Sequence, residues 1–116
     1  MRTPLTALLA LTLGGCYYDV EEELYPGGFC DTTAVTYAGM VEPLVQGNCA
    51  IPGCHVAGGQ SPDLGTYAGV KAAADAGLLV SLAVQGNPMP MPPSGLLSAC
   101  DRQRIEAWVN AGAPNN

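Results

Sequence analysis

The chain has 116 residues, of which 10 are acidic and 4 are basic, so its formal net charge is −6 with histidine neutral. This length allows one small domain, and the acidity excludes sequence-independent nucleic-acid binding, which needs clustered lysine and arginine. The 15 glycines and 10 prolines indicate many turns, and the single histidine excludes a metal site built from histidines alone.

Residues 1–15 have the layout of an export signal. Arg2 precedes an apolar stretch, Leu5 to Leu13, that is too short to span a bilayer. The segment Leu13-Gly14-Gly15-Cys16 resembles the lipobox of bacterial lipoproteins, in which an aliphatic residue and two small residues precede the lipidated cysteine. The resemblance implies removal of residues 1–15 and acylation of Cys16, which would anchor the chain to a bacterial membrane in the cell envelope, facing the periplasm or the exterior. The alternative is a plain signal peptide with Cys16 as an ordinary thiol.

The segment after this cysteine is acidic. Residues 17–29 include four acidic and no basic residues and have no clear period, so we interpret residues 16–29 as a flexible tether that begins at the lipidated cysteine. Loss of residues 1–15 removes Arg2 and leaves three basic and ten acidic side chains, a net charge of 3 − 10 = −7. Such a charge favours protein partners with basic patches.

Residues 30–116 carry helix signals, and no segment alternates convincingly at period two. Residues 36–47 place apolar side chains on one helical face, but Pro43 predicts that this helix is short, kinked or restarted there. Residues 66–76 form an Ala-rich helix that Thr66 caps and Gly77 ends. Residues 78–84 are apolar and predict a second short helix.

The last helix has the clearest limits. Ser98 is a good N-cap, Gly112 stands where a helix ends, and Pro114 blocks continuation. Ile105, Trp108 and Val109 form its apolar face. We therefore predict an all-α domain of three to five short helices with long Gly/Pro-rich connections.

The chemistry lies in the segment Cys49-Ala50-Ile51-Pro52-Gly53-Cys54-His55. Two cysteines with a histidine directly after the second is the arrangement that attaches c-type haem: each thiol adds to a vinyl group, and the histidine is the proximal iron ligand. Four residues separate the cysteines here instead of the usual two, and Pro52-Gly53 favours a tight turn in the longer loop. The alternatives are a Cys49–Cys54 disulfide with an exposed His55, a structural zinc site, and a catalytic Cys–His pair.

Two methionines follow in a proline-rich loop, Gly86-Asn87-Pro88-Met89-Pro90-Met91-Pro92-Pro93. Haem iron with a proximal histidine commonly takes a methionine sulfur on its other face. A methionine on a stiff loop ahead of the last helix is well placed for this role. The alternative is that Met89 and Met91 are turn residues without a ligand role.

Together these features resemble a family of small exported bacterial cytochrome c-like domains, and the similarity covers about residues 30–116. The family has a Cys–His attachment site, a Met-Pro-Pro loop and a closing Trp helix. The resemblance implies one covalent haem c held by Cys49 and Cys54, with His55 as the proximal ligand. It implies Met91 as the favoured distal ligand, with Met89 as the alternative. The residues that carry it are Tyr37, Val41-Glu42-Pro43-Leu44, Cys49, Gly53-Cys54-His55, Leu64, Tyr67-Ala68-Gly69-Val70-Lys71, Met91-Pro92-Pro93, Leu97-Ser98 and Ile105 to Pro114.

The implied fold is cytochrome c-like, with short helices around one haem and the first and last helices crossing. Val41, Leu44 and Val45 would then meet Ile105, Trp108 and Val109. If those helices cross, a disulfide between the remaining cysteines, Cys30 and Cys100, is geometrically plausible, and two unpaired thiols are the alternative.

From these features we expect a membrane-anchored monohaem c-type cytochrome that carries single electrons outside the cytoplasm and is not an enzyme. Ligation by histidine and methionine would leave no open site on the iron. The alternative is a disulfide-stapled lipoprotein module without haem that has a binding or structural role.

Overall fold

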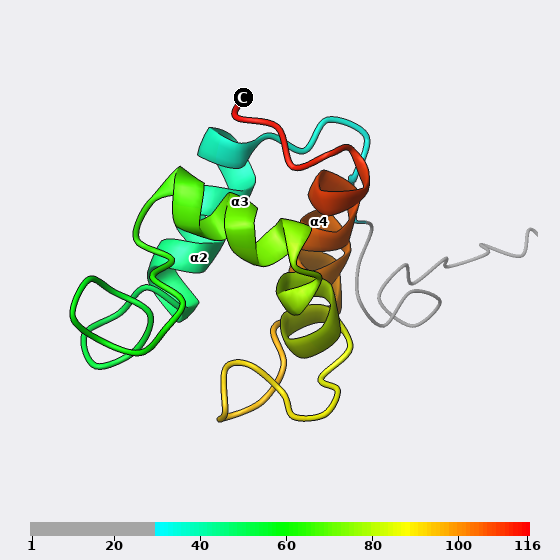
Figure 1. Ribbon diagram of the computed structural model, residues 1–116. Helices are drawn as coiled ribbons and strands as arrows, with labels where there is room; N and C mark the ends of the chain where they lie inside the picture. Colours follow the sequence, from blue (N-terminus) through cyan, green and yellow to red (C-terminus); the bar gives the residue numbers. More distant parts are fainter. Residues whose placement is uncertain (1–29) are drawn as a thin grey trace, which may run out of the picture.

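A π-helical turn and a short α-helix open the domain (Figure 1). In the computed structural model, which describes residues 30–116, η1 spans Tyr37–Val41 and α2 spans Glu42–Asn48. The Thr36 hydroxyl accepts a hydrogen bond from the Gly39 N–H and begins η1. Pro43 lies in the first turn of α2, where its missing N–H leaves no helix bond unmade. The helix therefore starts again at Glu42, which is one of the outcomes that the proline predicts.

The middle of the domain contains two further helical segments. The α-helix α3 spans Tyr67–Asp75, and the Thr66 hydroxyl caps it by accepting a hydrogen bond from the Gly69 N–H. Gly77 follows with φ of +75°, a left-handed conformation that ends helices and that glycine adopts without steric cost. The second π-helical segment, η2, spans Leu79–Val84. Both predicted helices are therefore present, and the second winds as a π-helix.

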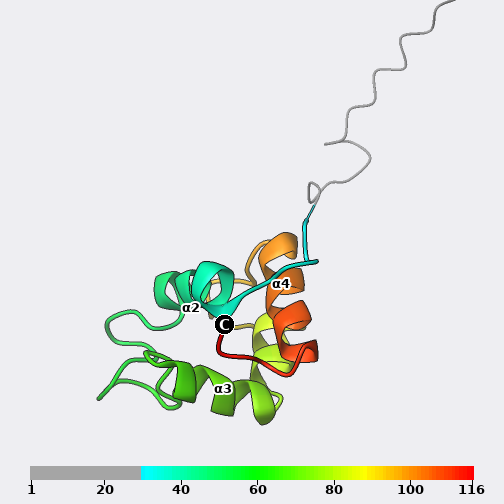
Figure 2. The same cartoon turned by 90° about the horizontal axis from the view of Figure 1, so that it is seen from above.

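The longest helix closes the domain. α4 spans Ala99–Asn110, and the Ser98 hydroxyl caps it by accepting a hydrogen bond from the Asp101 N–H at 3.1 Å. Its end is followed by Gly112, which has φ of +92°. Seen from above, the C-terminal residues lie between α2, α3 and α4 (Figure 2), where the Tyr67 hydroxyl donates to the Ala113 carbonyl.

The core forms where α4 packs on η1 and η2, and α2 contributes Val45 to the same cluster. Trp108 is fully buried, its indole N–H donates to the Pro114 carbonyl at 2.9 Å, and its ring centroid lies 5.6 Å from that of Tyr37. The hydroxyl of Tyr37 is buried without a hydrogen-bond partner among residues 30–116, and this burial raises the pKa of the phenol. The two faces that we expected to meet share one apolar cluster, whose members from these elements are Val41, Leu44, Val45, Ile105, Trp108 and Val109.

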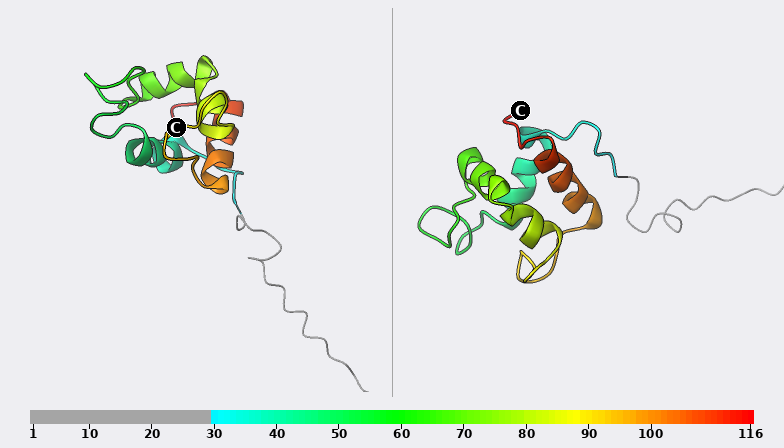
Figure 3. Two further views of the ribbon diagram at one scale, coloured as in Figure 1. Left: turned by 90° about the horizontal axis from the view of Figure 1, so that it is seen from below. Right: turned by 45° about the vertical axis from the view of Figure 1, so that its right-hand side comes forward.

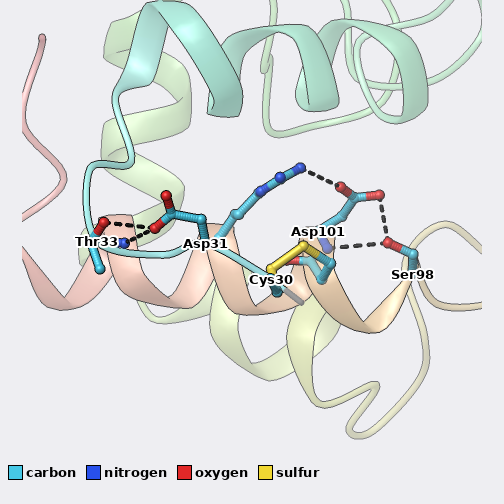
Figure 4. The surroundings of a disulfide bond; sticks show 7 residues. Cys30, Asp31, Thr33, Ser98 and Asp101 are labelled. Atoms are coloured by element: carbon cyan, nitrogen blue, oxygen red, sulfur yellow. Dashed lines mark hydrogen bonds and ion pairs between the residues drawn. A yellow bond between two sulfur atoms is a disulfide. The ribbon is translucent and has the colours of Figure 1, made fainter. Parts of the chain in front are cut away.

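A disulfide ties the start of the described chain to this last helix. Cys30 bonds to Cys100 in the first turn of α4, with their Cα atoms 5.3 Å apart, and the link closes a loop with a sequence separation of 70 residues. Figure 4 shows the bond beside the Ser98–Asp101 cap of α4. The loop between α2 and α3 extends from the body on the side opposite α4 (Figure 3). The disulfide pairing is the one that we favoured from the sequence.

Every regular element between residues 30 and 116 is helical, so the prediction of an all-α domain is confirmed for this part of the chain. None of the helices in that range has the length and apolar character needed to cross a membrane. The export signal at residues 1–15, Cys16 and the tether at residues 16–29 lie outside the described residues.

Replacing both disulfide cysteines, as in Cys30→Ser/Cys100→Ser, should lower the free energy of unfolding by about 4 kcal/mol, because the unfolded chain regains the entropy of a long open loop. Urea unfolding followed by far-UV circular dichroism measures the change. The wild-type protein treated with a reductant is the control and should unfold at the same urea concentration as the variant. Equal midpoints for the oxidised wild type and the variant would contradict the prediction.

Candidate functional site

The segment between the two unpaired cysteines folds into a closed turn directly after α2. Cys49 caps α2 by donating its N–H to the Val45 carbonyl at 2.8 Å. The His55 N–H then donates back to the Cys49 carbonyl at 2.9 Å. Gly53, at the position where the loop must reverse, has φ of +83°. The four residues between the cysteines therefore bulge out as one turn, and the backbone of Cys49 and His55 is brought together at its base.

His55 is oriented by a main-chain contact. Its Nδ1 lies 2.8 Å from the carbonyl oxygen of Pro62. Because a carbonyl can only accept, Nδ1 carries the hydrogen, and Nε2 keeps a free lone pair. A fixed ring with its second nitrogen bonded to a backbone carbonyl is the usual support of a metal-ligating histidine. His55 is thus presented in the tautomer that ligates through Nε2.

A cavity of about 490 Å³ lies at this turn. Cys49, Cys54 and His55 line it from the first loop, and Met91 to Ser94 line it from the proline-rich loop that follows η2. This volume falls within the range of small-molecule and cofactor sites, roughly 300–1,000 Å³. The structure therefore brings the attachment-site residues and one of the two candidate methionines to the same cavity.

A smaller cavity of about 60 Å³ continues into the core and shares Cys49, His55 and Met91 with the first. Pro62 also lines it. Its remaining walls are apolar side chains from α3, η2 and the connections beside them: Leu64, Ala73, Leu78, Leu79, Leu82 and Ala83. No acidic or basic side chain lines either cavity; the polar lining of the larger one is Asn48, Gln60, Ser61 and Ser94, with His55. The lining of the inner end suits apolar groups, and that of the outer end suits polar substituents.

The two methionines of the proline-rich loop differ in their surroundings. The Met91 N–H donates to the Leu82 carbonyl of η2 at 3.1 Å, and Met91 is half-buried against both cavities. Met89 is 55% exposed and lines neither cavity. The sequence spacing leaves open which methionine is the candidate ligand. In the structure, the hydrogen bond from the loop to η2 places Met91, and not Met89, at the cavity.

The four cysteines of residues 30–116 divide into two classes. Cys30 and Cys100 are bonded, whereas Cys49 and Cys54 are free and half-buried. Burial, with a smaller contribution from neighbouring Cys54, raises the pKa of the Cys49 thiol. Cys49 is therefore a protonated thiol at neutral pH. The pairing expected for the haem-free alternative, Cys49–Cys54, is not formed.

The donor set has the chemistry that covalent haem attachment needs: two free thiols, one imidazole with an available Nε2, and one thioether, all at one largely apolar cavity. The alternative of a structural zinc site is not supported by residues 30–116. Within residues 30–116, no three side chains of His, Cys, Asp or Glu come together as a ligand set for a metal ion.

Sequence reasoning missed the contacts made by main-chain carbonyls. Nothing in the residue type of Pro62 or Leu82 signals that its carbonyl would hold His55 or the Met91 backbone. It also gave no indication of the role of Arg102 in α4, whose side chain is half-buried and bonds to two carbonyls.

Comparison of the chain with family models, with curated proteins and with solved structures gives no match. The interpretation of the site therefore depends on its own geometry and chemistry.

In the haem-free full chain, iodoacetamide should modify Cys49 and Cys54 without a reductant, and Cys30 and Cys100 only after reduction. Because the pKa of Cys49 lies above the usual thiol value of 9.0, its rate should keep rising with pH beyond the point where an ordinary thiol reaches its plateau. Peptide mass spectrometry measures each site, with free cysteine as the control. Protection of Cys49 and Cys54 until reduction would instead indicate that they form a disulfide.

Proposed function

We propose that this chain is a membrane-anchored monohaem c-type cytochrome that carries single electrons outside the cytoplasm. The observation that carries the proposal is the meeting of Cys49, Cys54, His55 and Met91 at one cavity, although the methionine lies 36 residues beyond the histidine in the sequence (91 − 55). No other described cavity combines this set of donors with a pocket of cofactor size.

Each of these residues has one role in the proposal. Cys49 and Cys54 would hold the cofactor through thioether bonds, His55 would ligate iron through Nε2, and Met91 would be the second protein ligand of the iron. When bound, haem c supplies an iron that alternates between two oxidation states. The Pro62 carbonyl keeps His55 oriented, and the apolar inner walls exclude water.

The proposed fold is cytochrome c-like. Its support is the packing of α4 on η1 and η2, with the candidate attachment segment directly after α2 and the methionine loop directly before α4. Two helices from the two ends of the domain thus frame the segments that line the cavity. An electron carrier also fits this donor set, because ligation by both His55 and Met91 would leave no open position on the iron for oxygen or peroxide chemistry.

Export and anchoring through Cys16 remain part of the proposal. The Cys30–Cys100 disulfide supports it, because such bonds form and persist in oxidising compartments. Residues 30–116 hold six acidic and three basic side chains. This excess favours redox partners with basic patches and an encounter that weakens as salt is added.

Co-expression with haem-attachment machinery should give coloured protein with a c-type pyridine haemochrome spectrum and a mass increase equal to one haem. The Cys49→Ala/Cys54→Ala variant should lose the covalent adduct, because both thioether donors are gone. Cys30→Ser/Cys100→Ser is the control and should keep it. Colourless wild-type protein after competent maturation would reject the proposal and favour the haem-free module.

The far-red sulfur-to-iron absorption band of the oxidised protein should vanish in Met91→Ala and persist in Met89→Ala, because only Met91 lies at the cavity. Visible spectroscopy of the two matured variants measures this. Loss of the band in Met89→Ala alone would transfer the ligand role to that residue, and strong carbon monoxide binding by the reduced wild type would indicate an open iron site.

A further inference from the structure

Arg102 connects the two ends of the methionine loop. From the first turn of α4 its Nη1 donates to the Val84 carbonyl at 3.0 Å, and its Nε donates to the Leu97 carbonyl at 3.2 Å. Val84 is the last residue of η2, and Leu97 lies just before the Ser98 cap of α4. One guanidinium therefore holds together the points where the loop leaves the helical body and where it returns. Figure 1 shows the backbone of this loop at its lower end.

The contacts of Arg102 are made to the backbone and not to a carboxylate. The ion pairs in residues 30–116 join Lys71 to Asp75 and Arg104 to Asp101. A guanidinium presents its donors in a fixed planar fork, so it can hold two carbonyls at once in one geometry, which an ammonium cannot do as rigidly. The Val84 carbonyl is also among those that the end of a helix leaves unpaired, and a cation is favourable there.

The loop between these two points is otherwise docked by few contacts. The Asn87 N–H donates to the Ser81 carbonyl, the Met91 N–H donates to the Leu82 carbonyl, and the Leu96 side chain lies beside Gly86. Both backbone bonds end on η2, and Arg102 binds the last carbonyl of the same segment. Because α4 also packs directly on η2, loss of the clamp would leave these two helices together. It would free the loop residues next to Val84 and Leu97 and so enlarge the range of positions open to Met91, because a longer unrestrained loop has more conformations.

We propose that Arg102 is a positioning residue that keeps Met91 at the cavity by clamping the ends of its loop. The inference rests on the proposed function, in which Met91 ligates iron. Arg102 lines neither cavity, so it acts through the loop and not on the cofactor.

The test compares Arg102→Gln with Arg104→Gln in the matured full chain. Arg104 lies two residues further along α4, so its variant removes the same charge without touching the loop.

Imidazole is the probe, because it must displace the methionine to bind oxidised iron. The apparent affinity for imidazole rises by the same factor as the fraction of protein in which Met91 has left the iron. We expect imidazole to bind Arg102→Gln about tenfold more tightly than the wild type, and Arg104→Gln within about twofold of it. Arg102→Lys, which keeps the charge but not the fork, should fall between them.

A second readout does not need haem. Amide hydrogen exchange of residues 85–97 in the haem-free chain should be faster in Arg102→Gln than in Arg104→Gln, with exchange in α3 unchanged. Equal imidazole affinities and equal exchange in the two variants would overturn the clamp. If Arg102→Gln does not fold, as judged by circular dichroism, the same comparison between Arg102→Lys and Arg104→Lys decides it. A colourless wild type would reject the ligand role of Met91 and the proposed function, and faster loop exchange in Arg102→Gln would still establish the clamp as a structural device.

Discussion

The packing of α4 on η1 and η2 is the contact on which the rest of the domain depends. Trp108 and Ile105 share one buried cluster with Val41 and Val45, so elements from the two ends of the described chain share one core. Small domains gain little core for their surface, and here the disulfide at Cys30 adds a covalent constraint to the same pair of ends. Once this contact is made, the segment after α2 and the loop before α4 are held on one body, and the cavity between them follows.

The geometry of the candidate site depends on main-chain carbonyls more than on ion pairs. Pro62 orients His55, Leu82 holds the Met91 backbone, and Val84 with Leu97 receives Arg102. Each contact fixes a loop residue against a helical segment or a neighbouring turn. The candidate site can therefore be built from two long loops, because their functional positions are tied down individually while the rest of each loop lies at the surface.

The sequence predicts the helices well where caps and turns carry the signal. Ser98 and Gly112 mark the limits of α4, and Thr66 and Gly77 mark those of α3. The pair Pro52-Gly53 likewise predicts the turn between Cys49 and Cys54. The π-helical winding of η1 and η2 was not predicted, because it depends on packing and not on residue type. The carbonyl contacts and the clamp by Arg102 were missed for a related reason, since every residue has the same main-chain acceptor and only the fold selects which one is used.

The disulfide also has a mechanical consequence. Any tension applied to the polypeptide ahead of Cys30 enters the fold through the sulfur–sulfur bond at the first turn of α4. The loop closed by the disulfide contains residues 31–99, which include η1, α2, α3, η2 and every side chain that lines the larger cavity. A force applied between that side and the C-terminus would therefore run along the covalent chain through α4 and the residues after it. The chain of residues 31–99 would carry no covalent tension.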